Sequence, residues 1–149
     1  GAFGLIINRP TSIKLAEILP ELKSTKAGDL KVFFGGPVEP NTIFILKESN
    51  QAPPFDWGPF LAKDLAFLAE EWPKIPTPQR PVVRIFLGYS GWGPSQLETE
   101  IKFHSWKILP ADSNSVFFTK SANTWSNLLE KFGGVYKIAA KTGFKPCLN

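Results

Sequence analysis

The sequence predicts a single α+β domain over residues 1–149, with a mixed, mostly antiparallel and partly barrel-like sheet flanked by helices. Strand-like and helix-like segments follow one another without the regular alternation of a parallel βαβ protein, and no internal repeat is visible. A hydrophobic fraction of 43% with 20% charged residues is typical of a globular chain, and 14 prolines with 12 glycines indicate many turns.

The first third of the chain starts with a strand-like run. Residues 2–7 are apolar and partly β-branched, and Pro10 keeps the preceding residue out of the helical region. A helix is predicted next, capped by Thr11 or Ser12, with apolar residues at helical spacing until Pro20 interrupts it. The polar residues 21–29 are predicted to form a loop.

The middle of the chain predicts two short strands, a loop and a helix. Residues 31–34 form a strand that runs into a glycine turn at 35–38, and residues 42–46 form the clearest strand. Residues 49–58 are predicted as a loop whose aromatic side chains pack against another surface. Apolar residues at helical spacing predict an amphipathic helix over residues 60–72.

The last part begins with an elbow, since four prolines between residues 73 and 81 favour an extended connection. A strand over residues 82–87 ends at the glycine cluster 88–94, which predicts unusual backbone geometry or a close approach. The remaining predicted elements are a helix at 95–103, strands at 105–109 and 116–119, a helix at 122–132 that ends at Gly133-Gly134, and a short helix before Gly143.

Charge and cysteine content argue against several classes of function. The net charge is +4, but the basic residues are scattered singly, so no groove for a nucleic acid is expected. One cysteine, Cys147, cannot form an internal disulfide, which favours a reducing compartment. No apolar run is long enough to cross a bilayer, although association with the surface of a membrane complex is compatible with the sequence. Because the chain opens in an apolar run and lacks methionine, an upstream segment is expected.

Reactive side chains are few, and no catalytic, metal or cofactor site is predicted. The run Gly88-Tyr89-Ser90-Gly91-Trp92 is similar to a nucleophile elbow, but Trp92 replaces its final glycine. A serine nucleophile needs a base, and His104 is the only histidine, so a site would require Ser90, His104 and Asp112 to meet in space. One histidine and one cysteine cannot build a structural zinc site. Glu98 and Glu100 lie on different faces of their helix, which argues against a general acid and base pair.

Four blocks of sequence resemble the YqgE/AlgH family, which is found in bacteria and, with relatives, in plastids. They are GAFGLIINRPT at residues 1–11, FFGGPV at 33–38, GYSGWG at 88–93 followed by QLE at 96–98, and Trp106 with PAD at 110–112. The resemblance extends to about Phe132 and implies an α+β fold with a mixed, barrel-like sheet and no established enzymatic activity. One bacterial branch of the family is called a transcriptional regulator, although no helix-turn-helix is visible here.

The chain departs from the family pattern in two places. Family members carry some tens of residues before the first block, which contribute strands to the fold, so these first strands are expected to be lacking here. Residues 47–81 form a Trp57-containing, proline-rich version of a region that is shorter in bacteria. This departure favours the plastid stroma over the bacterial cytoplasm.

Three turns that end predicted strands are the best candidates for a binding site. If residues 8–11, 35–38 and 88–93 converge at one edge of the sheet, they form a pocket or a docking face. Two interpretations stay open, since the glycines of these turns could instead serve only to turn the chain. The predicted face consists of Asn8, Arg9, Gly36, Pro37, Tyr89, Ser90, Trp92 and Gln96.

The function predicted from these features is that of a non-enzymatic binding or structural subunit of a larger protein assembly. Thirteen Phe, five Trp and two Tyr supply the large aromatic side chains that protein contacts favour. Phe55, Trp57 and Phe60 are the predicted contacts with a protein partner. The alternatives are a transcriptional regulator of the AlgH type and a small-molecule hydrolase that uses Ser90.

Overall fold

The structure is a computed structural model that describes residues 1–51 and 53–143. It divides into two compact units, which we describe separately. The sheet unit is Phe3–Gly91, and the helical unit is the chain from Trp92 onward together with Gly1–Ala2.

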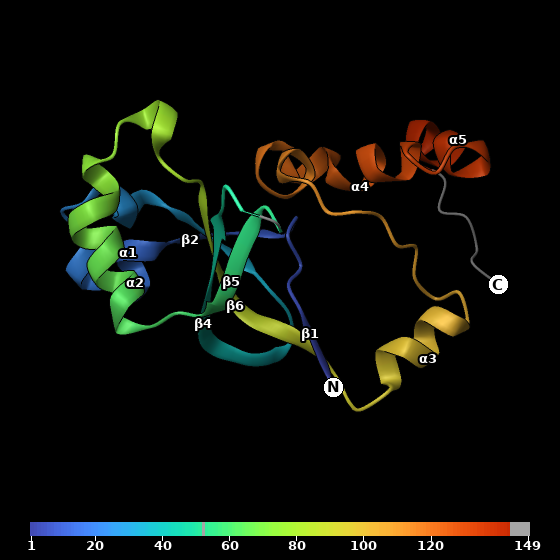
Figure 1. Cartoon of the computed structure of the whole chain (residues 1–149), viewed down its shortest axis with the longest axis horizontal. Helices are drawn as coiled ribbons and strands as arrows, with labels where there is room; N and C mark the ends of the chain where they lie inside the picture. Colours follow the sequence, from blue (N-terminus) through green and yellow to red (C-terminus); the bar gives the residue numbers. More distant parts are fainter. Residues whose placement is uncertain (52, 144–149) are drawn as a thin grey trace. The chain divides into compact units, whose positions relative to one another are not determined.

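The strands form one open, mixed sheet of six strands (Figure 1). The order is β2-β3-β6-β4-β5, and β1 pairs with β6 beside this path. The β3–β6 pair is parallel, whereas β2–β3, β4–β6 and β4–β5 are antiparallel. The predicted α+β class and mixed sheet are therefore confirmed, but the path from β2 to β5 does not close into a barrel. The strands are β1 Ala2–Gly4, β2 Pro10–Lys14, β3 Lys31–Phe34, β4 Val38–Glu48, β5 Phe55–Pro59 and β6 Val83–Trp92.

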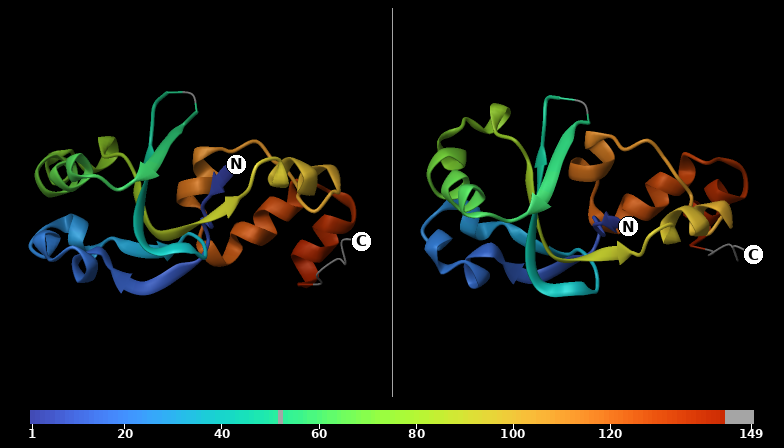
Figure 2. Two further views of the ribbon diagram at one scale, coloured as in Figure 1. Left: turned by 90° about the horizontal axis from the view of Figure 1, so that it is seen from below. Right: turned by 60° about the horizontal axis from the view of Figure 1, so that its bottom comes forward.

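Short helices fill the connections of the sheet unit and make up most of the helical unit. In the sheet unit, α1 and α2 lie alongside each other next to the sheet, and β4 and β5 form a projecting hairpin (Figures 1 and 2). In the helical unit, α4 and α5 pack as a pair. The helices are α1 Leu15–Ile18, η1 Pro20–Leu22, η2 Lys26–Asp29, α2 Ala62–Ala66, η3 Phe67–Glu71, η4 Trp72–Lys74, η5 Thr77–Gln79, α3 Gln96–Lys102, η6 Asn114–Phe118, α4 Ser121–Glu130 and α5 Gly134–Thr142.

One face of the sheet carries the main hydrophobic core. Val32 of β3 and Ile45 of β4 both lie opposite Ile85 of β6, so the three side chains form a row across the sheet. All three are at most 2% exposed. Leu15 of α1 and Leu68 of η3 are fully buried against this row. Burial of such aliphatic side chains contributes roughly 1.5–3 kcal/mol each, so this layer holds the helices on the sheet.

The opposite face carries a row of aromatic side chains. Phe86 of β6 lies opposite both Phe33 of β3 and Phe44 of β4, and the Phe33 and Phe86 ring centroids are 5.6 Å apart. The Arg84 guanidinium lies 4.8 Å from the centroid of the Phe33 ring and donates a hydrogen bond of 2.7 Å to the carbonyl of Ile7. Side-chain alternation along β6 thus separates an aliphatic face from an aromatic one.

The alternation reverses at Gly88. Strict alternation would place residue 89 with Leu87 on the aliphatic face, yet the Tyr89 ring lies 5.4 Å from that of Phe44 on the aromatic face. Gly88 has φ +67°, in the left-handed region that favours glycine. Its partner strand is irregular at the same level, since the pairing of β4 with β6 shifts between Val38 and Ile43. The bulge therefore brings Tyr89 to the aromatic side.

The loop expected over residues 21–29 contains the 3-10 helices η1 and η2, and the extended connection expected over residues 73–81 contains η4 and η5. Three further predictions in the sheet unit are wrong. The helix expected from Thr11 starts only at Leu15, because β2 pairs with β3 and half-buries alternate residues. Part of the expected loop over residues 49–58 is β5, which pairs with β4. The strand expected to end at the glycine cluster continues through it to Trp92. In each case strand pairing determines the conformation, although the local sequence does not show it.

In the helical unit, the two strands predicted at 105–109 and 116–119 are wrong. The first segment has no regular structure, and the second lies in the helical turn η6. The helices predicted at 95–103 and 122–132 are confirmed as α3 and α4, and the short helix before Gly143 is confirmed as α5. The strands predicted at 31–34, 42–46 and 82–87 and the helical region over residues 60–72 are also confirmed.

Candidate binding pocket

The three segments predicted to converge are residues 8–11, 35–38 and 88–93. The parts of them that belong to the sheet unit lie side by side. The amide of Phe34 donates to the carbonyl of Arg9 over 2.8 Å, and the amide of Ile6 donates to the carbonyl of Gly35 over 2.9 Å. Gly35 in turn donates to the carbonyl of Leu87 over 2.8 Å. Asn8, Arg9, Gly36, Pro37, Tyr89 and Ser90 lie in this unit, whereas Trp92 and Gln96 belong to the helical unit. A docking role for the set stays a prediction.

Gly36 allows two backbones to approach each other. A Cβ atom on Gly36 would overlap the carbonyl carbon of Tyr89 and the amide nitrogen of Ser90. Neither of these atoms belongs to a side chain that could move away. The Arg9 guanidinium lies 4.6 Å from the centroid of the Phe34 ring, at the edge of the same region. A glycine at position 36 is therefore explained by the close packing of the backbone, without a role in binding.

A pocket opens beside this contact, on the aromatic face of the sheet unit. Its cavity is about 360 Å³ in volume. Four aromatic rings line it in a chain of contacts, with centroid distances of 5.0 Å for Phe3 and Tyr89, 5.4 Å for Tyr89 and Phe44, and 6.5 Å for Phe44 and Trp57. The complete lining is Phe3, Glu39, Phe44, Trp57, Gly58, Pro59 and Tyr89.

The rings differ in exposure, which gives the pocket a buried part and an accessible part. Phe44 is 7% exposed, whereas Trp57 is 38% and Phe3 is 64% exposed. Glu39 belongs to the lining, and its carboxylate accepts a hydrogen bond of 3.1 Å from the Thr42 hydroxyl. Its φ of +47° is uncommon for a residue other than glycine and costs about 1 kcal/mol or more. The site can therefore receive an apolar group, or a cation that benefits from ring faces and a carboxylate.

The structure separates the three predicted partner contacts. Trp57 lies in the pocket, and Phe55 is half-buried on the same strand. Phe60 instead packs against the hydrophobic core. Sequence reasoning missed Phe3, Phe44 and Glu39, because only the pairing of β1 and of β4 with β6, together with the bulge at Gly88, brings them to Tyr89. Residues 43–46 form a continuous apolar run, so no local alternation indicates the face on which Phe44 lies.

In the helical unit, Trp92 and Gln96 are joined through Glu100. Trp106 donates to the Glu100 carboxylate over 2.8 Å, Gln96 over 3.0 Å and Trp92 over 3.1 Å. These hydrogen bonds, with that of Trp106 the strongest, lower the pKa of Glu100. The two indole rings are 5.7 Å apart in an edge-to-face contact. Through Glu100, Trp92, and Gln96 at the start of α3, are therefore connected to Trp106 in the segment after α3.

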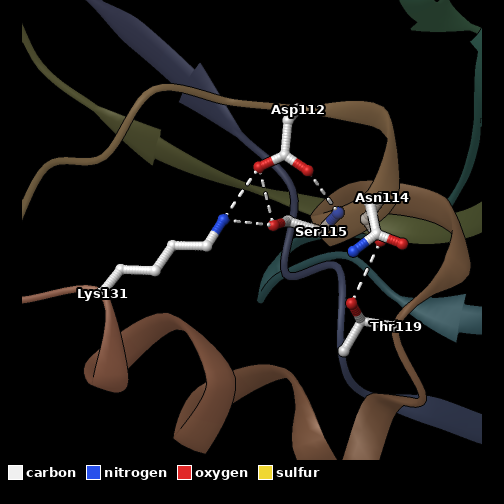
Figure 3. A network of polar contacts seen from close by, with 5 residues as sticks. All are labelled: Asp112, Asn114, Ser115, Thr119 and Lys131. Carbon is white, nitrogen blue, oxygen red and sulfur yellow. Dashed lines mark hydrogen bonds and ion pairs between the residues drawn. The ribbon is translucent and has the colours of Figure 1, made fainter. Parts of the chain in front are cut away.

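Asp112 takes part in a second polar network of the helical unit, together with Ser115 and Lys131 (Figure 3). One carboxylate oxygen accepts from the Ser115 amide over 2.8 Å, and the other accepts from the Ser115 hydroxyl over 2.8 Å and from Lys131 Nζ over 3.0 Å. The Ser115 amide, then Lys131 and the Ser115 hydroxyl, lower the pKa of Asp112 to about 2. With so low a pKa, the Asp112 carboxylate is a weak base and a poor acceptor for the proton of a nucleophile. The ion-paired ammonium group of Lys131 has no lone pair, so it cannot accept that proton either. The arrangement is that of a helix cap for η6.

This network predicts a pH dependence of stability. A carboxyl whose pKa falls from 3.8 to about 2 on folding stabilises the folded state above pH 3.8, and this contribution is lost as the pH falls through about 2. Asn at position 112 would keep an oxygen for the Ser115 amide but lose the charge. We expect Asp112→Asn to be less stable than the wild type in urea at pH 7, with the difference shrinking between pH 4 and pH 2. An equal difference at both ends of this range would contradict the assignment.

Two kinds of feature are absent from residues 1–51 and 53–143. No group of three or more His, Cys, Asp or Glu side chains is arranged to hold a metal ion in this part of the chain. No helix within the same residues is both long and apolar enough to cross a membrane.

Comparison with known proteins identifies the family. The sequence pattern of the AlgH-like family matches residues 1–137. The chain belongs to this family. A UPF0301 protein of Cytophaga hutchinsonii is 33% identical over 100% of the chain and 82% of its own length. A UPF0301 protein of Methylococcus capsulatus is 38% identical over 89% of the chain and 73% of its own length. The resemblance based on the four sequence blocks is thus confirmed.

Two solved structures have a similar fold. The solution structure of the AlgH protein from Pseudomonas aeruginosa superposes with a TM-score of 0.69 and 27% identity, over 97% of the chain and 79% of that structure. The crystal structure of protein DIP2367 from Corynebacterium diphtheriae superposes with a TM-score of 0.66 over 93% of the chain and 74% of that structure. At 19% identity this second likeness concerns the fold alone.

Proposed function

We propose that this AlgH-like chain is a non-enzymatic binding subunit of a larger protein assembly, and that its partner occupies the aromatic pocket. The observation that carries the proposal is the row of rings from Phe3 to Trp57 around a cavity of about 360 Å³. Trp and Tyr are the side chains that most often dominate binding energy when a partner covers them. Phe3 and Trp57, at 64% and 38% exposed, are accessible for such a contact.

The position of Trp57 supports binding through side chains. Trp57 lies on β5, which is an edge strand of the sheet. Edge strands can bind a partner by adding a strand, but Pro59 lacks an amide donor and Asp56 carries an exposed charge. Both features disfavour strand addition, which leaves the aromatic rings as the recognition surface of this edge.

The non-enzymatic character of the proposal is supported by the engagement of Asp112. This residue was the carboxylate considered for a site with Ser90 and His104. Its two oxygens accept three hydrogen bonds from Ser115 and Lys131. The alternative of a hydrolase that uses Ser90 predicts that Ser90→Ala abolishes ester hydrolysis. We expect instead that ester hydrolysis by the wild type and by Ser90→Ala is the same.

The proposal places the chain in a reducing compartment, either the bacterial cytoplasm or the plastid stroma. The relatives named above, from Cytophaga and Methylococcus, are bacterial. They support the bacterial compartment, whereas the proline-rich region at 47–81 was the reason to favour the plastid.

The binding role is tested by comparing two exposed tryptophans. We expect a protein that co-purifies with the wild-type chain from its native source to be lost with Trp57→Ala and retained with Trp125→Ala. Trp125 is 44% exposed, similar to Trp57, but lies on α4 outside the pocket. Association is measured by quantitative affinity purification from cells that produce each variant. A partner retained by Trp57→Ala, or a co-purifying nucleic acid in place of a protein, would refute the proposal.

A further inference from the structure

The aromatic pocket has the composition of a site for an organic cation. Neighbouring rings are inclined to each other by 63° for Phe3 and Tyr89, 65° for Tyr89 and Phe44, and 43° for Phe44 and Trp57. Rings inclined in this way present faces from several directions instead of one flat stack. The face of an aromatic ring carries negative potential, so several faces around one space attract a cation.

Glu39 adds a formal negative charge to the same lining. This matters because the chain as a whole has a net charge of +4, whereas the one charged residue of the pocket lining is acidic. The residue holds a left-handed backbone conformation with φ +47°. Strain of this kind is retained where the surrounding structure fixes it, and it is concentrated at binding sites.

Two basic side chains of the strands around the pocket are engaged elsewhere. On the aromatic face, the Arg84 guanidinium lies against the Phe33 ring and donates a hydrogen bond to the carbonyl of Ile7. Lys47 of β4 has the same parity as Ile45, on the aliphatic face, and its Nζ lies 3.0 Å from Asp64 Oδ1. Phe44, which lines the pocket, has the opposite parity and lies on the aromatic face. The positive charge of Lys47 is therefore neutralised on the side of the sheet away from the rings.

We propose that this pocket binds a methylated ammonium group. Such a group is large and weakly hydrated, so it loses little solvation when rings surround it, and its charge suits the ring faces and Glu39. A cavity of about 360 Å³ has room for a trimethylammonium head and the carbon chain attached to it. The inference rests on the proposed binding function and names the chemistry of the recognised group.

The head group has two natural sources, which the experiment separates. One is a free quaternary ammonium compound such as choline, and the other is a methylated lysine side chain of a partner protein. Both present the same cation to the rings. A trimethyl-lysine peptide that binds more tightly than choline assigns the site to a protein partner, and the reverse order assigns it to a small molecule.

The test is a titration of the full chain with choline and with its neutral carbon analogue, in which a tert-butyl group replaces the trimethylammonium. Binding is followed by the indole NMR signal of Trp57 and by calorimetry. We expect choline to bind at least about tenfold more tightly than the analogue, because the two differ only in charge. Trp57→Leu should weaken choline binding about tenfold, whereas the matched variant Trp125→Leu should leave it unchanged.

Glu39→Gln gives a second readout that does not depend on the rings. It should weaken choline binding roughly threefold or more and leave binding of the neutral analogue within about twofold, since only the charge is removed. Equal affinity for choline and the analogue, or no binding of either, would overturn the inference. If Trp57→Ala still loses its protein partner in that case, the proposed binding function stands without this ligand.

Discussion

Gly36→Ala is expected to destabilise the sheet unit by about 3 kcal/mol, which is a large fraction of the stability of a domain of this size. The added methyl group would overlap the carbonyl carbon of Tyr89 and the amide nitrogen of Ser90. Both are backbone atoms of β6, so relief requires a shift of the strand and not a change of rotamer. The same shift would move Tyr89 and disturb the aromatic pocket.

Gly58→Ala is the matched control for this substitution. Gly58 lines the same pocket, but a Cβ atom at this position would meet no atom within 4 Å. We expect its free energy of unfolding to change by no more than about 0.5 kcal/mol. Urea unfolding followed by tryptophan fluorescence measures both variants. Equal stabilities for the two would mean that the turn after β3 is not in close backbone contact with β6 at Gly36.

Removing the carboxylate of Asp64 is expected to cost about 3 kcal/mol, because it breaks a buried ion pair. Asp64 is 3% exposed, its Oδ1 lies 3.0 Å from Lys47 Nζ, and its Oδ2 accepts a hydrogen bond of 2.9 Å from the Leu61 amide at the start of α2. Asp64→Ala would leave the lysine without its main partner and the amide unsatisfied. The α2 helix should detach from β4 at this end.

Asp56→Ala serves as the control for this prediction. Its carboxylate lies 3.9 Å from the same Lys47 Nζ, but its side chain is 74% exposed. Exposed pairs of this kind contribute about 0–1 kcal/mol, so the variant should resemble the wild type. A double-mutant cycle with Lys47→Met separates the ion pair from the hydrogen bond to Leu61. A coupling energy near zero between Lys47 and Asp64 would contradict the role given to the pair.

The fold could be predicted wherever a segment carries its own pattern. The β-branched and aromatic runs at 42–46 and 82–87 are strands, and the amphipathic pattern of 122–132 is the helix α4. Predictions were wrong where pairing with a distant strand determines the conformation. Thr11 illustrates this, because its hydroxyl donates to the carbonyl of Val32 over 2.8 Å within β2, while its sequence context suggests a helix cap. The aromatic run at 116–119 has strand propensity but lies in η6, and no strand pairs with it among the described residues.

The candidate site was only partly predictable for a related reason. Tyr89 and Trp57 were selected from glycine-rich and aromatic segments, and both line the pocket. Phe3 comes from β1, whereas Glu39 and Phe44 come from β4, and the register of these two strands against β6 is not encoded in any local motif. Ser90 was singled out with Tyr89, but the bulge at Gly88 sends the side chain of Tyr89, and not that of its neighbour, toward Phe44.

The left-handed residue at position 88 makes the sidedness of this strand depend on a single backbone conformation. If position 88 took the ordinary extended conformation of a strand, every later side chain of β6 would exchange sides. A hydroxymethyl group would then face the cavity, and a phenol would be forced among the packed aliphatic side chains. Homologous chains that keep the pocket should therefore either carry glycine at this position or lack the extra residue altogether, since a strand that is shorter by one residue restores the alternation with the phenol on the same side.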